Sequence, residues 1–326
     1  MTPILQVKNL QTHFFTKAGV LKAVDGVSFE IGAGEIIGLV GESGSGKSIT
    51  GFSILGLVDA PGRIVDGQIV FKGRDMTSIP PSEMQKLRGS RIAMIFQDPM
   101  MTLNPVLRIE TQMIEAILTH DSSIGKEEAR QRSRDALGLV GISSPEERMR
   151  AYPHQFSGGM RQRVSIAIAM LNRPDLIIAD EPTTALDVTI QGQVIHEMQK
   201  LCKSTKTALL WITHDLAVVA GISNRICVMY AGRIVEQGPN EALIGNPLHP
   251  YTNGLLGSVP SQNRRGEPLR QIEGIVPSLL NLPVGCAFEN RCGNVVSKCS
   301  VSAPEEETLK DGRIIRCYNQ TNSKNK

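Results

Sequence analysis

Hydrophobic and polar positions along the chain follow two different periods. Short apolar runs bounded by glycine or polar residues predict buried strands at Glu35–Val40 and Ile92–Phe96. Apolar residues three or four positions apart predict helices at Ile109–Leu118 and Lys126–Leu139. The first forty or so residues predict strands joined by turns, and the stretch from about residue 100 to 156 predicts a mostly helical insert.

From Ser157 onward the two periods alternate. The predicted elements are a helix over Gly158–Leu171, a strand over Leu176–Ala179, a helix over Thr189–Lys203, a strand over Ala208–Thr213, a helix over Asp215–Ile222 and a strand over Arg225–Tyr230. Such alternation implies a parallel sheet that is covered by helices on both faces. The sequence therefore predicts the α/β fold class.

The pattern changes near residue 245. Prolines become more frequent after Gly245, and the hydrophobic periodicity weakens. A chain of 326 residues has room for about two domains. We therefore expect one domain over residues 1–245 and a small irregular extension over residues 246–326.

Charge and hydropathy narrow the function classes. The chain carries 35 Lys and Arg against 32 Asp and Glu, and its first 245 residues carry 25 of each sign. A neutral main body argues against nucleic-acid binding driven by phosphate neutralisation. No apolar run reaches about 18 residues and the start lacks a secretory pattern, so we expect a cytosolic chain with reduced thiols.

A glycine-rich segment carries the clearest chemistry. Residues 41–48 read Gly-Glu-Ser-Gly-Ser-Gly-Lys-Ser and match the phosphate-loop pattern G-x-x-x-x-G-K-[ST] between a predicted strand and a predicted helix. Glycines let backbone N–H groups point at phosphates, and the following helix presents its positive end. Lys47 is expected to neutralise β- and γ-phosphate oxygens, and the Ser48 hydroxyl is expected to bind Mg²⁺. The pattern predicts ATP contacts from Gly41, Ser43, Gly44, Ser45, Gly46, Lys47, Ser48 and Ile49.

Polar residues follow two later strands. Asp180 and Glu181 end the apolar run Leu176–Ala179, and His214 follows the run Ala208–Thr213. Strand carboxyl ends line the ligand crevice of a parallel sheet. Asp180 is therefore expected to hold Mg²⁺, Glu181 to orient or deprotonate an attacking water, and His214 to reach the γ-phosphate.

Four of the six cysteines lie in the extension. Cys286, Cys292, Cys299 and Cys317 have the spacing C-x5-C-x6-C-x17-C. In a reducing compartment this crowding favours metal ligands over disulfides. The spacing contains neither a zinc-ribbon knuckle nor a compact ferredoxin run, so an iron–sulfur cluster, zinc and free thiols all remain open. The other two, Cys202 and Cys227, are expected to be buried structural thiols.

Six motifs in order give the chain a family resemblance. The phosphate loop is followed by Gln97, by Phe156-Ser-Gly-Gly-Met-Arg-Gln162, by Asp180-Glu181, by Ala185-Leu-Asp187 and by His214. Over residues 4–240 the chain resembles the nucleotide-binding subunit of an ABC transporter. The resemblance implies a P-loop NTPase (RecA-like) core with an N-terminal antiparallel β subdomain and a helical insert.

The resemblance also assigns further residues. Gln97 would touch Mg²⁺ or water and join the core to the helical insert, and Asp187 would lie at a dimer seam. Phe14 most resembles the aromatic residue that stacks on adenine, with Phe15 as its rival. The residues implied to bind the ATP of a partner subunit are Ser157, Gly158, Gly159 and Gln162.

The extension narrows the family. Asn246-Pro-Leu-His-Pro-Tyr-Thr252 resembles the segment after the ATPase core in dipeptide, oligopeptide and nickel importers, and Tyr152-Pro-His is also typical of that group. The cysteine-bearing tail is similar to that of ATPase subunits in which four cysteines bind a [4Fe–4S] cluster. By this resemblance Cys286, Cys292, Cys299 and Cys317 would hold such a cluster, with zinc as the alternative.

The function implied is an ATP-hydrolysing subunit that powers peptide import from the cytoplasmic face of the membrane. Its implied partners are a second ATPase subunit, expected to be a paralogue in a heterodimer, two transmembrane permeases and an extracytoplasmic solute-binding protein. Import of nickel or another peptide-like solute is the alternative. An exporter subunit, or a soluble ATPase of DNA repair or translation, fits the motifs and the single ATPase core less well. A redox-sensing role for the tail is left open by the sequence.

Overall fold

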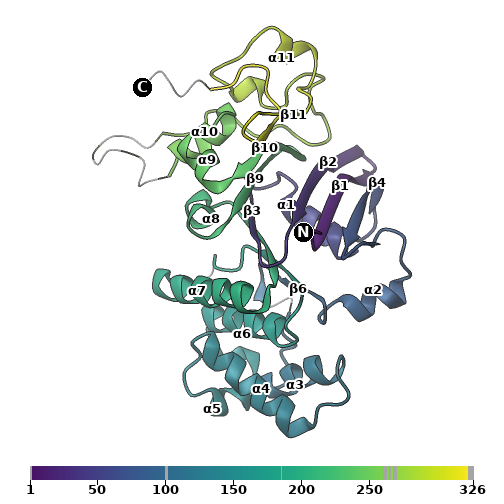
Figure 1. The fold of residues 1–326 in the computed structure, drawn as a ribbon, viewed down its shortest axis with the longest axis vertical. Helices are drawn as coiled ribbons and strands as arrows, with labels where there is room; N and C mark the ends of the chain where they lie inside the picture. The colour runs from purple at the N-terminus through teal and green to yellow at the C-terminus, as the bar shows by residue number, and fades with distance from the viewer. Residues whose placement is uncertain are drawn as a thin grey trace. The chain divides into compact units, whose positions relative to one another are not determined.

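A computed structural model describes residues 2–99, 102–184, 186–259, 263, 266 and 270–321 (Figure 1). The chain divides into two compact units. Unit 1 comprises Met1–Ile4, Ile31–Glu35 and Ser78–Trp211, and unit 2 comprises Leu5–Glu30, Ile36–Thr77 and Ile212–Lys326.

Unit 2 begins with an antiparallel sheet of strand order β2-β1-β4-β5. A second group of strands has the order β11-β12-β10-β9-β3, in which β3 pairs with β9 in parallel and the other pairs are antiparallel. The elements of the first part of unit 2 are β1 (Leu5–Thr16), β2 (Gly19–Ile31), β3 (Ile36–Val40), α1 (Lys47–Ile54), β4 (Gly62–Phe71), β5 (Arg74–Asp75), α8 (Leu216–Ile222), β9 (Arg225–Tyr230) and β10 (Arg233–Pro239).

The C-terminal extension belongs to unit 2 and contains little regular structure. Two short strands carry it onto the edge of β10, where Ile314 and Ile315 of β12 pair with Gln237 and Glu236. It follows α9 (Asn240–Gly245), and its elements are α10 (Pro250–Gly257), the 3₁₀ turn Glu289–Arg291, α11 (Lys298–Val301), β11 (Glu307–Thr308) and β12 (Ile314–Ile315).

Unit 1 contains the strand order β8-β7-β6 together with a group of helices. Every residue of β7 and β8 is buried, as expected for strands that are covered on both faces. Its elements are α2 (Pro81–Leu87), β6 (Ile92–Ile95), α3 (Ile109–Leu118), α4 (Lys126–Leu139), α5 (Pro145–Met149), the 3₁₀ turn Pro153–Gln155, α6 (Gly158–Met170), β7 (Leu176–Asp180), α7 (Val188–Thr205) and β8 (Ala208–Thr213), whose last two residues fall in unit 2.

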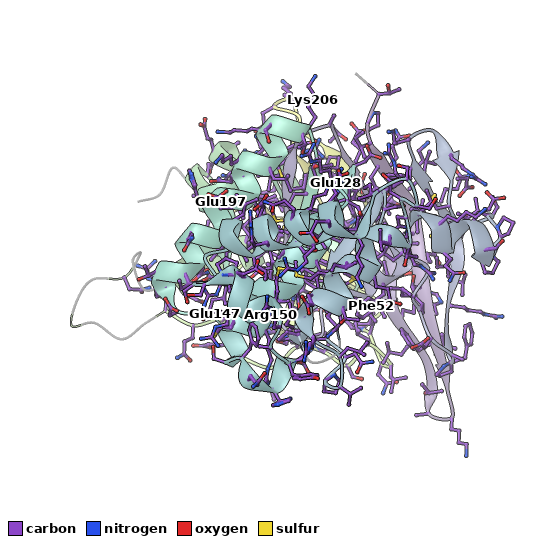
Figure 2. All side chains as sticks on the ribbon, turned by 90° about the horizontal axis from the view of Figure 1, so that it is seen from below. Phe52, Glu128, Glu147, Arg150, Glu197 and Lys206 are labelled. Carbon is purple, nitrogen blue, oxygen red and sulfur yellow. The ribbon has the colours of Figure 1, made fainter. Side chains whose placement is uncertain are left out.

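The helical insert lies within unit 1, where α4 packs against α3, α5 and α6 (Figure 1). The helix α4 buries Ala129, Ser133 and Leu137, which are spaced four residues apart and so share one face. The opposite side is charged. Figure 2 labels one of its exposed side chains, Glu128, together with the exposed Glu147 of α5 and Arg150, which follows α5.

Most predicted elements are present within one or two residues, and the helices Ile109–Leu118 and Lys126–Leu139 have the predicted bounds. The strands expected in the first forty or so residues are β1, β2 and β3, of which β1 and β2 continue through mixed polar and apolar positions. The short helices α2, α5, α9 and α10 were not predicted, since none is long enough to show a clear period.

Two further expectations concern membranes and disulfides. No helix among the described residues is long and apolar enough to cross a membrane. None of the six cysteines forms a disulfide, and Cys202 and Cys227 are buried as predicted. Burial raises the pKa of the Cys202 thiol to about 12, so this thiol is not a reactive one.

Candidate functional site

The phosphate loop occupies the turn from β3 into α1, as predicted, and its shape depends on glycine. Gly44 and Gly46 have φ angles of +77° and +102°, which other residues rarely adopt. A Cβ atom on Gly46 would lie 2.1 Å from the Ala23 carbonyl oxygen, and one on Gly41 would lie 2.1 Å from that of Met229. No side chain caps α1, so its first N–H groups remain suited to an anion.

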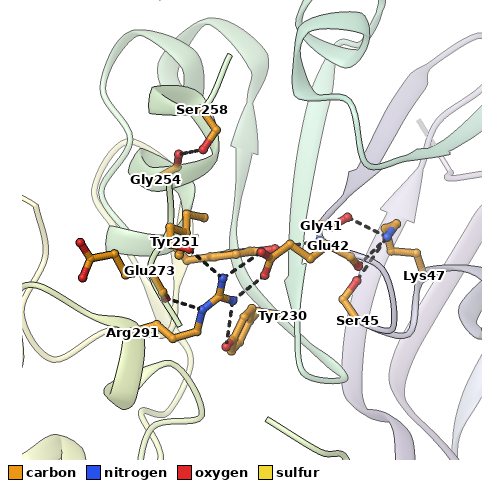
Figure 3. Close-up of polar contacts among 11 residues, drawn as sticks. Gly41, Glu42, Ser45, Lys47, Tyr230, Tyr251, Gly254, Ser258, Glu273 and Arg291 are labelled. Carbon is orange, nitrogen blue, oxygen red and sulfur yellow. Dashed lines mark hydrogen bonds and ion pairs between the residues drawn. The ribbon is translucent and has the colours of Figure 1, made fainter. Parts of the chain in front are cut away.

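Lys47 lies folded across this loop (Figure 3). Its ammonium donates hydrogen bonds to the carbonyl oxygens of Gly41 at 2.7 Å and Glu42 at 2.9 Å, and to Ser45 Oγ at 3.4 Å. The side chain is buried, whereas Ser43 and Gly44 at the loop tip are exposed. The loop thus combines a buried ammonium group with an exposed backbone at its tip, an arrangement that suits phosphate binding.

Phe14 and Phe15 lie near the end of β1, and their side chains have different surroundings. Phe14 is half-buried and pairs with Gly62, whose Cβ, if present, would lie 2.5 Å from the Phe14 ring. Phe15 is 41% exposed, and the Arg63 guanidinium lies 4.4 Å from its ring centroid. One face of Phe15 is therefore already covered, and the assignment of Phe14 to adenine stays a prediction.

His214 also belongs to unit 2 and directly follows β8. It is exposed, and its neighbour Asp215 caps α8 by accepting the N–H groups of Ala217 and Val218 at 2.8 and 3.3 Å. The cap fixes where the helix begins and so holds His214 at the strand end, where the sequence predicts it.

Unit 1 brings Gln97 and Glu181 together. The strands β6 and β7 pair in parallel, with Ile95 opposite Ala179, so the residues after their carboxyl ends become neighbours. Gln97 Nε2 donates to Glu181 Oε2 at 3.1 Å, and Thr184 Oγ1 donates to the same oxygen at 3.2 Å. Asp180, one residue earlier, is buried.

Glu181 also has an unusual backbone. Its φ angle is +46°, a conformation that costs a residue other than glycine about 1–3 kcal/mol. Strain of this kind is typical of residues that are held for function. The two hydrogen bonds to its carboxylate and the strained backbone together fix the orientation of a potential general base.

The segment from Ser157 begins α6. Ser157 is exposed, and its Oγ accepts the Met160 N–H at 3.3 Å as a helix cap. A Cβ on Gly158 would meet nothing within 4 Å, so this helix start is open to a ligand. Gln162 differs, because it is buried and its amide donates to the Phe96 carbonyl oxygen at 3.3 Å. The structure therefore places Gln162 beside the residue that precedes Gln97 and apart from the exposed start of α6.

Asp187 caps α7 by accepting the Ile190 N–H at 3.0 Å, and both Asp187 and Val188 are exposed. Ala185 of the same motif lies outside the described residues.

The extension contributes residues to the phosphate loop that the sequence did not predict. Arg291 forms a two-pronged ion pair with the Glu42 carboxylate, at 2.6 and 2.9 Å, and the Tyr251 hydroxyl accepts the Glu42 N–H at 2.8 Å (Figure 3). These contacts join residues more than 200 positions apart. No local pattern signals them, although Tyr251 lies in the motif that the sequence singles out in the extension.

Two family models match the chain. Residues 24–184 match the model described as ABC transporter, and residues 235–299 match the one described as oligopeptide/dipeptide transporter, C-terminal region. The oligopeptide transport ATP-binding protein AppD of Bacillus subtilis is 50% identical over 98% of this chain and 97% of its own length. The oligopeptide transport ATP-binding protein OppD of Escherichia coli is 47% identical over 97% of this chain and 93% of its own length.

The chain belongs to the family of ATP-binding subunits of ABC transporters. The fold agrees, because the ATP-binding cassette MJ0796, in a structure bound to ADP and Pi, matches with a TM-score of 0.67 at 26% identity, over 72% of this chain and 98% of that one. This confirms the predicted P-loop NTPase core. The protein is therefore an ABC-type ATPase, which hydrolyses ATP.

The tail cysteines of this ABC ATPase lie near one another in the extension. Cys286 N–H donates to the Cys299 carbonyl oxygen at 2.7 Å, and burial together with the nearby Cys299 and Cys292 thiols raises the pKa of Cys286. In the part of the chain that the structure describes, no group of three or more His, Cys, Asp or Glu side chains is arranged to hold a metal ion. A zinc ion needs its thiolates at about 2.3 Å from one point. Neither the predicted [4Fe–4S] cluster nor the zinc alternative is therefore supported by the arrangement of the described side chains.

Proposed function

We propose that this ABC ATPase powers the import of dipeptides and oligopeptides across the cytoplasmic membrane, as one subunit of a multi-subunit transporter. The observation that carries the proposal is the match of residues 235–299 to the oligopeptide/dipeptide transporter C-terminal region, on a chain that aligns with AppD over 98% of its length. The extension is thus the part that separates this chain from other ABC ATPases. We take residues 1–245 as the ATPase domain and residues 246–326 as the transporter-type extension.

The chemistry follows from the two groups of residues described above. Glu181 would deprotonate the attacking water, with Gln97 holding the carboxylate from 3.1 Å away. Lys47 would neutralise the β- and γ-phosphates, and His214 would contact the γ-phosphate. Mg²⁺ would take ligands from Ser48, Asp180 and Gln97, and would supply charge neutralisation at the phosphates when bound.

A second ATPase subunit completes the proposal. Ser157, Gly158 and Asp187 are exposed, and the open start of α6 offers N–H groups to an anion. We propose that Ser157, Gly158 and Gly159 bind the ATP of a paralogous subunit, with Asp187 at the seam. Two permeases and an extracytoplasmic binding protein would complete the importer, with this subunit on the cytoplasmic face and the helical insert contacting the permeases.

The relatives favour peptides over nickel, because both relatives named above are oligopeptide transport proteins. A soluble role in DNA repair or translation has no supporting observation. The identity of the solute lies with the binding protein and the permeases in this proposal.

The test is transport by the reconstituted complex. Proteoliposomes with the permeases and binding protein should accumulate labelled peptide when ATP is supplied, and Glu181→Gln should lower ATP hydrolysis at least about 100-fold while ATP still binds. Glu147→Gln, an exposed change on α5, is the matched control and should hydrolyse ATP normally. Peptide uptake unaffected by loss of this subunit would refute the proposal, and undiminished hydrolysis by Glu181→Gln would refute the general-base role.

We further propose that Cys286, Cys292, Cys299 and Cys317 hold a [4Fe–4S] cluster. All four are free thiols within residues 286–317, and the Cys286 N–H donates to the Cys299 carbonyl oxygen at 2.7 Å, which brings two of them together. Such a cluster assigns each thiolate to a different iron, so the sulfurs need not converge on a single ion. Anaerobic purification followed by iron and sulfide assays tests this. Stoichiometric zinc without iron, or thiols without metal, would overturn it.

A further inference from the structure

Glu42, the second residue of the phosphate loop, is held at three points (Figure 3). Its carboxylate pairs with Arg291, its N–H donates to the Tyr251 hydroxyl at 2.8 Å, and its carbonyl oxygen accepts from Lys47 Nζ at 2.9 Å. The first two partners come from the C-terminal extension. The third is the lysine that is expected to bind phosphate. The extension and Lys47 therefore contact the same residue.

The Arg291 side chain is held in place by burial and by contacts other than its ion pair with Glu42. Its side chain is only 4% exposed, and its Nε donates to the Glu273 carbonyl oxygen at 3.0 Å. The guanidinium also lies 5.8 and 5.9 Å from the ring centroids of Tyr230 and Phe288. A planar fork of donors held in this way matches a carboxylate at two points and fixes its direction as well as its distance.

The turn that carries Arg291 is part of the cysteine module. Glu289 N–H donates to the Cys286 carbonyl oxygen at 3.0 Å, and Cys292 N–H donates to that of Glu289 at 3.1 Å. The 3₁₀ turn Glu289–Arg291 is thus bounded by two cysteines. A change in the conformation of this turn would move the guanidinium.

Tyr251 is fixed by a second route. His249 caps α10 by accepting the Tyr251 N–H on Nδ1 at 3.0 Å, and the Tyr251 ring packs 4.6 Å from that of Tyr230 and 5.4 Å from that of Phe288, centroid to centroid. Upstream, the buried Glu236 carboxylate accepts the N–H groups of Leu248 and His249 at 3.0 and 2.9 Å. The motif around His249 therefore has a structural task, which is to place the Tyr251 hydroxyl.

The charge on Glu42 explains why this arrangement matters. A carboxylate in a phosphate loop repels the anion that the loop binds, unless a cation neutralises it. Arg291 supplies that cation to the carboxylate, while Lys47 donates to the backbone carbonyl oxygen of the same residue. Loss of Arg291 would therefore expose the loop to an uncompensated negative charge and release one end of Glu42.

We propose that Arg291 and Tyr251 are positioning residues for the phosphate loop, through which the C-terminal extension sets the affinity of this ATPase for nucleotide phosphates. The proposal rests on the phosphate-binding role proposed above for the loop and Lys47. It assigns to the extension a direct part in nucleotide binding.

The test uses the full chain and MgADP, which contacts the loop and is not consumed. Calorimetric titration of Arg291→Ala should show a Kd about tenfold above wild type, and Tyr251→Phe a rise of about three- to fivefold. Steady-state ATP hydrolysis should show the same rise in KM with kcat changed less. Arg291→Lys, which keeps the charge and loses the fork, should lie between Arg291→Ala and wild type.

A double variant distinguishes the loss of charge neutralisation at Glu42 from a general disruption of the local structure. Because Glu42→Gln removes the carboxylate that Arg291 neutralises, the pair Glu42→Gln with Arg291→Ala should bind MgADP more tightly than Arg291→Ala alone. The matched control is Arg316→Ala, which breaks an ion pair to Glu306 inside the extension at 3.0 Å and should leave the Kd unchanged.

Each remaining outcome has a definite meaning. An unchanged Kd in Arg291→Ala, an equal rise in Arg316→Ala, or simple additivity in the double variant would overturn the positioning role. Wild-type protein that fails to bind MgADP and to hydrolyse ATP would instead overturn the proposed function.

Discussion

The phosphate loop and the C-terminal extension lie in the same unit but obtain their shapes in opposite ways. The loop is formed by eight consecutive residues, and two glycines with positive φ angles determine its path. The extension has short helices and strands that are held by partners outside it, namely Glu236 for the segment around His249, 13 residues later, and Glu42 for Arg291, 249 residues later. A local structure of the first kind is visible as a motif, whereas a docked structure of the second kind is not.

The comparison also predicts that the loop and the extension respond to different kinds of substitution. A loop that depends on backbone conformation should tolerate no added side chain at its tight points. An extension that depends on buried polar contacts should respond to the loss of a single partner and to pH. The three predictions below test this contrast.

The largest effect is expected from Gly46→Ala. The new Cβ would lie 2.1 Å from the Ala23 carbonyl oxygen at a φ angle of +102°, so both a backbone clash and strain arise. We expect loss of measurable MgADP binding and a free energy of unfolding lower by about 5 kcal/mol. Titration calorimetry and urea denaturation measure the two quantities.

Gly44→Ala is the matched control for this change. Its φ angle is +77°, but an added Cβ would meet nothing within 4 Å. Only the backbone strain remains, which should lower the free energy of unfolding by about 1–2 kcal/mol. Equal losses of stability in the two variants would contradict the idea that close backbone packing shapes the loop.

The next effect is expected from Glu236→Ala. The wild-type carboxylate is fully buried, accepts two backbone N–H groups and lies 3.8 Å from Arg313. Its removal leaves these two buried donors unpaired and takes one of two acidic neighbours from Arg313, which keeps Asp311 at 2.8 Å, and this should cost about 3–4 kcal/mol. Urea denaturation measures the loss, and limited proteolysis should show earlier cleavage of the extension.

Glu241→Ala changes an exposed acid on the neighbouring α9 and should alter the free energy of unfolding by less than about 0.5 kcal/mol. Equal losses in the free energy of unfolding for Glu236→Ala and Glu241→Ala would contradict the idea that the Glu236 carboxylate holds the extension in place.

The smallest effect is a pH dependence from His249. Burial lowers its pKa from 6.5 to about 3 in the folded protein. Below pH 6.5 the unfolded chain binds a proton that the folded chain does not. The contribution of His249 to the free energy of unfolding is therefore complete above that pH and is lost as the pH falls. The expected loss is about 1.4 kcal/mol for each pH unit below about 6.5.

His249→Asn keeps a side-chain acceptor for the α10 cap and has no such proton to bind, so its stability should fall less steeply with decreasing pH. Burial raises the pKa of the neighbouring Glu236, whose own effect has the opposite sign, but Glu236 is present in both proteins and largely cancels in their difference. If the free energies of unfolding of wild type and His249→Asn changed in parallel between pH 5 and 7, His249 would not be the source of this pH dependence.

The sequence by itself determined the parts of this protein that depend on local chemistry. The glycines and Lys47 of the phosphate loop, the acids after β7 and the serine and aspartate caps of α6 and α7 act on their immediate neighbours. The alternation of strands and helices also indicated the α/β class, because strands covered on both faces must be continuously apolar.

Only the tertiary structure decided which of these residues meet. The parallel register of β6 and β7 places Gln97 against Glu181, and burial turns Gln162 inward although it lies in the same motif as Ser157. The same holds for Arg291 and Tyr251, which reach the phosphate loop from more than 200 residues away. Their contacts depend on the packing of an aromatic cluster and a buried carboxylate, and packing of this kind has no period that a sequence can show.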